Sequence, residues 1–155
     1  MPALSTLRLT LRPDTDGTAE LFVEAASAGF AGRASAWFNV REIAEFAQAL
    51  NAFPLLADDP PRLQGGFSEA TRGKPTVVQE HVFLQIRRAG KRGTLAVEVR
   101  LATPHWNGDP PSARRRAAFT FLTDYRALQG FASAVGSLAA GTTDEALMAS
   151  DVDQV

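Results

Sequence analysis

One segment of this chain is echoed later in the sequence. Residues 39–50, NVREIAEFAQAL, align with residues 124–135, DYRALQGFASAV, at an ungapped offset of 85 residues (124 − 39). Each segment begins with a residue that caps helices well, Asn39 or Asp124. Apolar residues at helical spacing follow in both copies. The echo predicts two similar halves, each ending in one amphipathic helix, and both gene duplication and convergence explain it.

Strict alternation of apolar and polar residues predicts two hairpins. Residues 7–11 and 21–25 alternate on either side of a Pro- and Gly-containing turn. Residues 82–86 and 95–101 alternate on either side of a second glycine-containing turn. The two hairpins therefore give each half a pair of antiparallel strands before its helix.

Further strands are predicted around these hairpins. Residues 33–38 and 117–121 alternate and lead directly into the two capped helices. Residues 62–68 predict a short strand weakened by two glycines, and residues 69–75 read as an exposed loop. The Gly-Phe-Ala-Gly run at residues 29–32 predicts a bulge at the start of a strand.

These elements predict the α+β class. The two helices must bury one apolar stripe each, and the nearest apolar faces are those of the strands. We expect an antiparallel sheet of about six or seven strands with both helices packed on it. The echo suggests that the chain is organised as two β-β-(β)-α halves. A β-sandwich with two helical appendages is the alternative. We expect one domain over residues 1–141 and a flexible tail over residues 142–155, which has few large apolar residues.

Composition excludes several classes of function. The 155 residues carry a net charge of −1, so no overall field attracts nucleic acid or an anionic membrane. The absence of cysteine excludes disulfides, thiol nucleophiles and thiolate metal sites. No apolar run approaches the roughly 20 residues that a membrane span needs. Because the first residues lack the features of a signal peptide, we expect a cytoplasmic protein.

Catalytic signatures are sparse. His81 and His105 fit no local zinc motif, and no Gly-x-Ser-x-Gly elbow is present. We therefore expect no cofactor and no metal, and a non-enzymatic protein is favoured over an enzyme. The alternative is a small-ligand site or an enzyme in a crevice between sheet and loops, and its candidate residues are His105, Asp109, Arg100 and Glu98.

Aromatic and basic residues outside the main apolar faces form the candidate interaction surface. Two are tryptophans, which often anchor protein interfaces, and the others are outward-facing phenylalanines and arginines of the strands. The set is Trp37, Phe22, Phe83, Trp106, Arg87, Arg100 and Arg115. The basic run 114–116 suits an acidic partner, nucleic acid or a solvated strand face paired with glutamates. Since few aromatics alternate with the bases, stacking of single-stranded nucleic acid is disfavoured.

The chain resembles the WapI-type immunity proteins and related small bacterial proteins. The resemblance lies in the Gly-Phe-Ala-Gly run at 29–32, the strand with Trp37, the helix at 39–50, the strand Gly93–Leu101, and the strand leading into the Asp124-capped helix. It implies a small α+β protein that neutralises a cognate toxin by binding it, without catalysis. The stretch 58–79 and the Pro-rich loop depart from that pattern.

Three hypotheses follow from these observations. The first is a non-enzymatic protein that binds a partner protein, in the manner of an immunity protein. The second is the small-ligand site or enzyme described above. The third is a homo-oligomer in which the outward sheet face is buried between subunits, because aromatic residues on that face need a cover.

Overall fold

The computed structural model describes residues 4–90 and 92–152. Strands and helices follow one another in the same order twice. The first half contains β1 (Ser5–Pro13), β2 (Thr18–Ser27), β3 (Phe30–Asn39), α1 (Val40–Leu50) and β4 (Arg62–Thr71). The second contains β5 (Lys74–Arg88), β6 (Thr94–Ala102), the 3-10 turn η1 (Pro111–Ala113), β7 (Arg116–Asp124), α2 (Tyr125–Ala140) and β8 (Glu145–Ser150).

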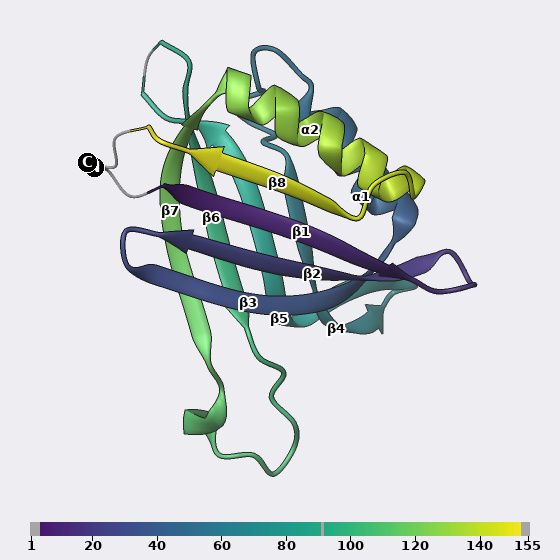
Figure 1. The fold of residues 1–155 in the computed structure, drawn as a ribbon. Coiled ribbons are helices and arrows are strands. Elements are labelled where there is room, and N and C mark those ends of the chain that lie inside the picture. The colour runs from purple at the N-terminus through teal and green to yellow at the C-terminus, as the bar shows by residue number, and fades with distance from the viewer. Residues whose placement is uncertain (1–3, 91, 153–155) are drawn as a thin grey trace.

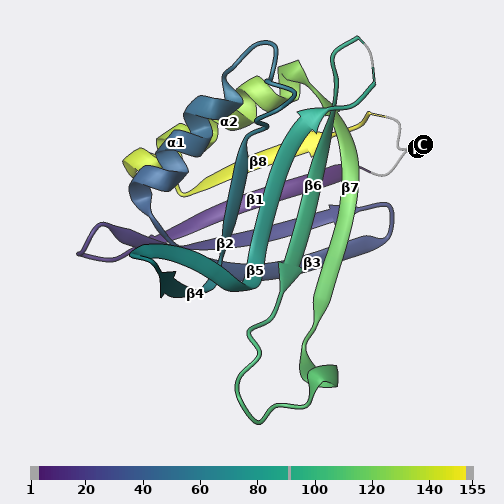
Figure 2. The same cartoon turned by 180° about the vertical axis from the view of Figure 1, so that it is seen from behind.

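The eight strands form two antiparallel sheets. Sheet A has the order β3-β2-β1-β8, and sheet B has the order β4-β5-β6-β7. Figure 1 and Figure 2 show the strands of one sheet running across those of the other, and β3 contacts all four strands of sheet B. The α+β class is confirmed, but the prediction of a single sheet of six or seven strands is wrong. Each set of three strands alternates only along one face, so two sheets facing each other bury both apolar faces at once.

The last strand of each half joins the sheet of the other half. β4 follows α1 and pairs with β5, whereas β8 follows α2 and pairs with β1. Each sheet therefore contains three consecutive strands of one half and one strand of the other. This exchange gives both halves the order β-β-β-α-β, in which β4 contains the predicted strand 62–68 and β8 is the strand that the sequence analysis does not predict. The echoed segments occupy equivalent places, from the end of β3 into α1 and from the end of β7 into α2.

The two helices begin where the sequence predicts, and each buries one apolar stripe as predicted. The Glu42 carboxylate accepts a hydrogen bond from the backbone N–H of Asn39 at 3.2 Å, and Asp124 Oδ1 accepts one from the N–H of Ala127 at 2.9 Å. α1 and α2 lie side by side and close the side of the core bordered by β4 and β8 (Figures 1 and 2). Their buried residues are Ile43, Phe46, Ala47 and Leu50 in α1 and Leu128, Phe131, Ala132, Val135 and Leu138 in α2.

The sheets approach most closely where glycine replaces a side chain. A Cβ added to Gly32 of β3 would lie 2.6 Å from Ala117 Cβ of β7, and one added to Gly65 would lie 2.6 Å from Phe38 Cζ. Gly32 and Ala117 are themselves related by the offset of 85 residues. Equivalent points of the two halves therefore face each other where β3 crosses β7.

The prediction of a flexible tail is wrong for Glu145–Ser150. These residues form β8, in which Ala146, Met148 and Ser150 are buried. Ser150 Oγ also donates a hydrogen bond to the carbonyl of Leu122 at 2.8 Å. Sequence analysis does not predict this strand, because its alternation is short and includes the small residues Ala and Ser. Residues 153–155 of the predicted tail lie outside the described residues.

Two further sequence predictions fail at tight turns. The register between β2 and β3 is continuous through Ser27 and Phe30, so the expected bulge is absent and Ala28 and Gly29 form a two-residue turn with φ of 51° and 87°. Residues 69–75 are not a loop, because β4 and β5 continue to a second two-residue turn. Positive φ at both central residues matches the twist of a hairpin, but Ala28 and Arg72 stand where Asn, Asp or Gly is usual, so the usual turn signal is missing from the sequence.

Candidate functional site

The predicted interaction surface divides between opposite sides of the molecule. Trp37 and Phe22 lie on the outer face of sheet A, where the Arg12 guanidinium is 5.4 Å from the centre of the Phe22 ring. Phe83, Arg87 and Arg100 lie on the outer face of sheet B, and Trp106 and Arg115 lie in the loop between β6 and β7. The sheets face each other across the core, so these groups form two separate surfaces.

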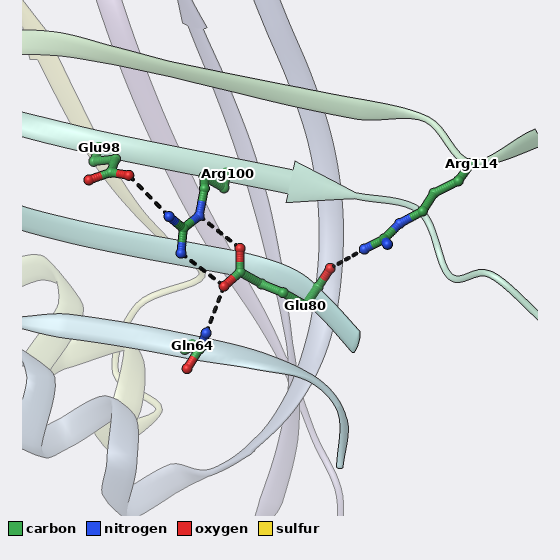
Figure 3. Close-up of polar contacts among 5 residues, drawn as sticks. All are labelled: Gln64, Glu80, Glu98, Arg100 and Arg114. Atoms are coloured by element: carbon green, nitrogen blue, oxygen red, sulfur yellow. Dashed lines mark hydrogen bonds and ion pairs between the residues drawn. The ribbon is translucent and has the colours of Figure 1, made fainter. Parts of the chain in front are cut away.

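Arg100 is held in place on the outer face of sheet B. Its guanidinium donates two hydrogen bonds to the Glu80 carboxylate, at 2.8 and 3.0 Å, and a third to Glu98 at 3.3 Å (Figure 3). Gln64 Nε2 donates to the same Glu80 carboxylate at 2.7 Å. Bidentate pairing of this kind fixes the plane of the guanidinium. The hydrogen bonds to Glu80 raise the pKa of Arg100 above its usual value.

Because of this network, Phe83 is not accessible to a binding partner. The Arg100 guanidinium lies over the Phe83 ring at 3.6 Å from its centre, and only 4% of Phe83 is exposed. Phe83 does point away from the main core, as predicted, but the arginine covers it. Phe83 and Arg100 are directly opposite in the β5–β6 register, so the predicted hairpin contained the signal for this contact. Arg87 lies four residues along β5 from Phe83, away from the loop.

The loop of residues 103–115 is bound to β5 by Gln79. Gln79 Nε2 donates to the carbonyl of His105 at 2.9 Å, and Gln79 Oε1 accepts from the N–H of His105 at 2.8 Å. Gln79 Oε1 also lies 2.6 Å from His81 Nε2, which assigns the proton of neutral His81 to that nitrogen. At the base of the loop, the N–H of Thr103 donates to the carbonyl of Arg115 at 2.9 Å. Figure 1 shows the loop projecting beyond the sheets.

Trp106 is exposed although its surroundings are ordered. The side chain of Asp109 accepts a hydrogen bond from the N–H of Trp106 at 3.0 Å. The Phe67 ring centre is 4.8 Å from that of Trp106 and 4.6 Å from that of His81, so the three rings form a row. Nevertheless 60% of Trp106 is exposed. The indole thus packs against Phe67, and the rest of its surface is open to solvent.

Two of the four residues that order or underlie the loop, Gln79 and Phe67, were missed by sequence analysis. Gln79 and Phe67 support the loop, His81 is buried beneath it, and Arg114 donates to the carbonyl of Glu80 at 2.7 Å (Figure 3). Burial, and secondarily the positive charge of Arg114, lower the pKa of His81. No local pattern identifies a glutamine that bonds a loop 26 residues away. The two histidines, by contrast, were noted, and their contact with one glutamine links them.

The residues proposed for a ligand site or an enzyme do not form a catalytic arrangement. The His105 ring contacts the backbone carbonyl of Asp109 at 3.0 Å, while the Asp109 carboxylate is used by the N–H of Trp106. No His–carboxylate pair results, and Arg100 is engaged by Glu80 and Glu98. Within residues 4–90 and 92–152, no three His, Asp or Glu side chains gather as metal ligands would. In the same residues, no helix has the length and apolar character of a membrane span.

Comparison of the chain with protein-family models, with curated proteins and with solved structures finds no significant match. The candidate site is therefore interpreted from its own geometry. That geometry offers an ordered, projecting loop with an exposed indole rather than a set of groups arranged for proton or group transfer.

Proposed function

We propose that this protein binds another protein without catalysing a reaction, and that the β6–β7 loop with Trp106 makes the central contact. The observation that carries this proposal is that Trp106 remains 60% exposed while Gln79, Asp109 and Phe67 order the loop around it. A binding loop that is already ordered loses less entropy on association. Tryptophan is also among the residues that contribute most to interface energies.

The kind of partner to test first is a toxin. The resemblance to WapI-type immunity proteins suggests it, and a protein that neutralises a toxin by occupying its surface needs a rigid contact rather than a reaction centre. An immunity role predicts that expression of this protein protects cells that produce the cognate toxin. Replacement of Trp106 by Ala removes that protection under this proposal.

A photo-crosslinking experiment tests the contact. A benzoylphenylalanine residue is placed at position 106 in one variant and at position 37 in another, and both are irradiated in host cells. Trp37 is a matched control because it is 53% exposed but lies on the outer face of sheet A. We expect a discrete protein adduct at position 106 and not at position 37. Adducts of equal yield at both positions, or at neither, would contradict the proposal.

Self-association through the outer face of sheet A is a second candidate function. Trp37 and Phe22 lie on that face among residues of both charges, including the ion pair of Arg33 with Glu24 at 3.3 Å. A face with both charges is complementary to a second copy of itself. Analytical ultracentrifugation tests this candidate: wild type should form a dimer that Trp37→Glu dissociates, and a monomeric wild type at high concentration excludes it.

A further inference from the structure

β7 is the least protected of the four strands at the edges of the sheets. β8 has six residues and contacts α2, β4 is interrupted by two register shifts, and β3 contacts sheet B along its length. β7 has nine residues, RAAFTFLTD, in continuous register with β6. It contains no proline, and no charge lies between Arg116 and Asp124. Soluble proteins usually protect such an edge, because its unpaired backbone groups can bind another strand.

The register shows which backbone groups of β7 face outward. The carbonyl of Arg115 accepts from the N–H of Thr103, so the backbone of residue 115 points toward β6. In an antiparallel pair this direction alternates from residue to residue. The N–H and C=O groups of Arg116, Ala118 and Thr120 therefore point away from β6. No other strand of the described residues pairs with that side of β7.

The other end of β7 is partly occupied. The carbonyl of Leu122 accepts from Ser150 Oγ at 2.8 Å, which agrees with an outward direction for even-numbered residues. The open edge thus extends from Arg116 to Thr120, next to the projecting loop. Figures 1 and 2 both show β7 as the outermost strand of its sheet on this side.

Positive charge lies at the loop end of the open edge, whereas Glu98 lies opposite Thr120 at the other end. Within the described residues, Arg114, Arg115 and Arg116 form no ion pair with a carboxylate. Arg114 and Arg116 line a shallow pocket of about 320 Å³ together with the exposed Val78. The buried Nε of Arg114 has no hydrogen-bond partner. Arg114 donates to a backbone carbonyl, that of Glu80, and arginines without a carboxylate partner attract carboxylates.

We infer that the partner binds by adding an extended acidic segment to β7, with its backbone paired to Arg116–Thr120 and its carboxylates at the arginines of residues 114–116. This inference rests on the proposed function and names the chemistry of the partner. Strand addition obtains its affinity from main-chain hydrogen bonds and its specificity from alternate side chains. Acidic residues of the added segment on the outer face of sheet B meet Arg114 and Arg116 at the loop end of the edge, while Trp106 contacts the partner beside the strand.

Synthetic peptides test the charge and the conformation together. The probe is Ac-Glu-Val-Glu-Val-Glu-Val-NH2, and the matched controls carry Gln or Lys in place of Glu. Binding is followed by indole fluorescence and by backbone amide NMR in 50 mM and 300 mM salt. We expect the Glu peptide to bind at least tenfold more tightly than the Gln peptide, to weaken at high salt, and to protect the amides of Ala118 and Thr120 from exchange.

Two variants separate the backbone from the charge. Ala118→Pro removes one outward N–H without removing a hydrogen bond to β6, and should weaken binding at least tenfold while the circular dichroism spectrum is unchanged. Arg116→Glu should weaken binding similarly, whereas Arg41→Glu, the same charge change on the exposed face of α1, should not. Unchanged affinity of both Ala118→Pro and Arg116→Glu would overturn the inference. Tighter binding of the Lys peptide, of a dT12 oligonucleotide or of a second copy of the chain would also overturn it.

The outcomes for the edge and for the loop are distinguishable. If a partner is crosslinked through position 106 but binds Arg116→Glu and Ala118→Pro as well as wild type, the inference fails and the proposed function stands. If the acidic peptide protects the β7 amides but position 106 yields no adduct, the edge site stands and the proposed function fails.

Discussion

The two halves of the molecule differ most in the connection between their second and third strands. β2 and β3 are joined by the two residues Ala28 and Gly29, whereas β6 and β7 are joined by residues 103–115. Strand order and the direction of strand exchange are the same in both halves. The short turn demonstrates that this scaffold needs no long loop at that place. Under the proposed function, the long loop is the binding element of the second half.

The side chains around each connection support this interpretation. Gln79, Phe67 and Asp109 all make contacts whose effect is to order the β6–β7 loop. Trp37, on the first half, has no ring contact among those described, whereas Trp106 rests on Phe67. Trp37 and Trp106 are similarly exposed, but Trp106 is held more firmly.

Replacing the β6–β7 loop removes the main difference between the two halves, and this change has the largest expected effect. Residues 104–114 are exchanged for Asn-Gly, so that Thr103 and Arg115, whose backbones are already hydrogen-bonded, flank a two-residue turn like that between Ser27 and Phe30. We expect a folded protein by circular dichroism and complete loss of partner capture. Unfolding of this variant would show that the loop stabilises the scaffold, and retained capture would place the contact elsewhere.

Truncating one core side chain in each exchanged strand tests whether the halves depend on each other equally. Met148 of β8 and Leu63 of β4 are 1% and 4% exposed. Replacement of either by Ala should lower the free energy of unfolding by about 2–5 kcal/mol, because it leaves a cavity in the core. Urea denaturation measures both values. A loss below about 2 kcal/mol, the lower end of that range, for Met148→Ala but not for Leu63→Ala would mean that β8 contributes less than β4.

A substitution at the crossing of β3 and β7 should have a smaller effect on stability, and a second substitution should reverse it. Gly32→Ala should lower the free energy of unfolding by about 1–3 kcal/mol, because the new Cβ meets Ala117 Cβ at 2.6 Å and neither atom can rotate away. Combining it with Ala117→Gly exchanges the two residues between the halves and should restore most of the loss. Gly130→Ala, on the exposed side of α2 with no atom near its new Cβ, is the control and should stabilise slightly. A double variant no more stable than Gly32→Ala contradicts the explanation.

Sequence predicted those parts of the fold that have local causes. Asn39 and Asp124 identify the helix starts because a cap acts within four residues, and alternation identifies the hairpins because adjacent strands pair. The strand exchange was not predicted, since the pairing of β8 with β1 joins residues at opposite ends of the chain and short alternating runs such as EALMAS have no distinctive signal. For the same reason the two sheets entered the sequence analysis only as the alternative, a β-sandwich with two helical appendages.

The candidate site, like the fold, was predicted only where its causes are local. Trp37 and Trp106 are exposed, but Phe83 is covered by Arg100, a contact that depends on cross-strand register. The support of Trp106 depends on Gln79 and Phe67, which lie on strands whose extent was underestimated. Side chains that act by position in space rather than by type leave no motif in a single sequence.

The smallest expected effect concerns His81, which lies under the long loop and has no counterpart under the short turn. Burial and Arg114 lower its folded-state pKa, while the unfolded value is about 6.5. As the pH falls below about 6.5, the unfolded chain binds a proton that folded His81 does not, so the free energy of unfolding decreases until the folded pKa is reached. The decrease is at most about 1.4 kcal/mol per pH unit for one such group. Urea denaturation between pH 7.5 and pH 5.5, a window about one unit either side of the unfolded pKa, should show this slope in wild type and in His105→Gln. His81→Gln should reduce it, and an equal slope in that variant would assign the proton uptake to another group.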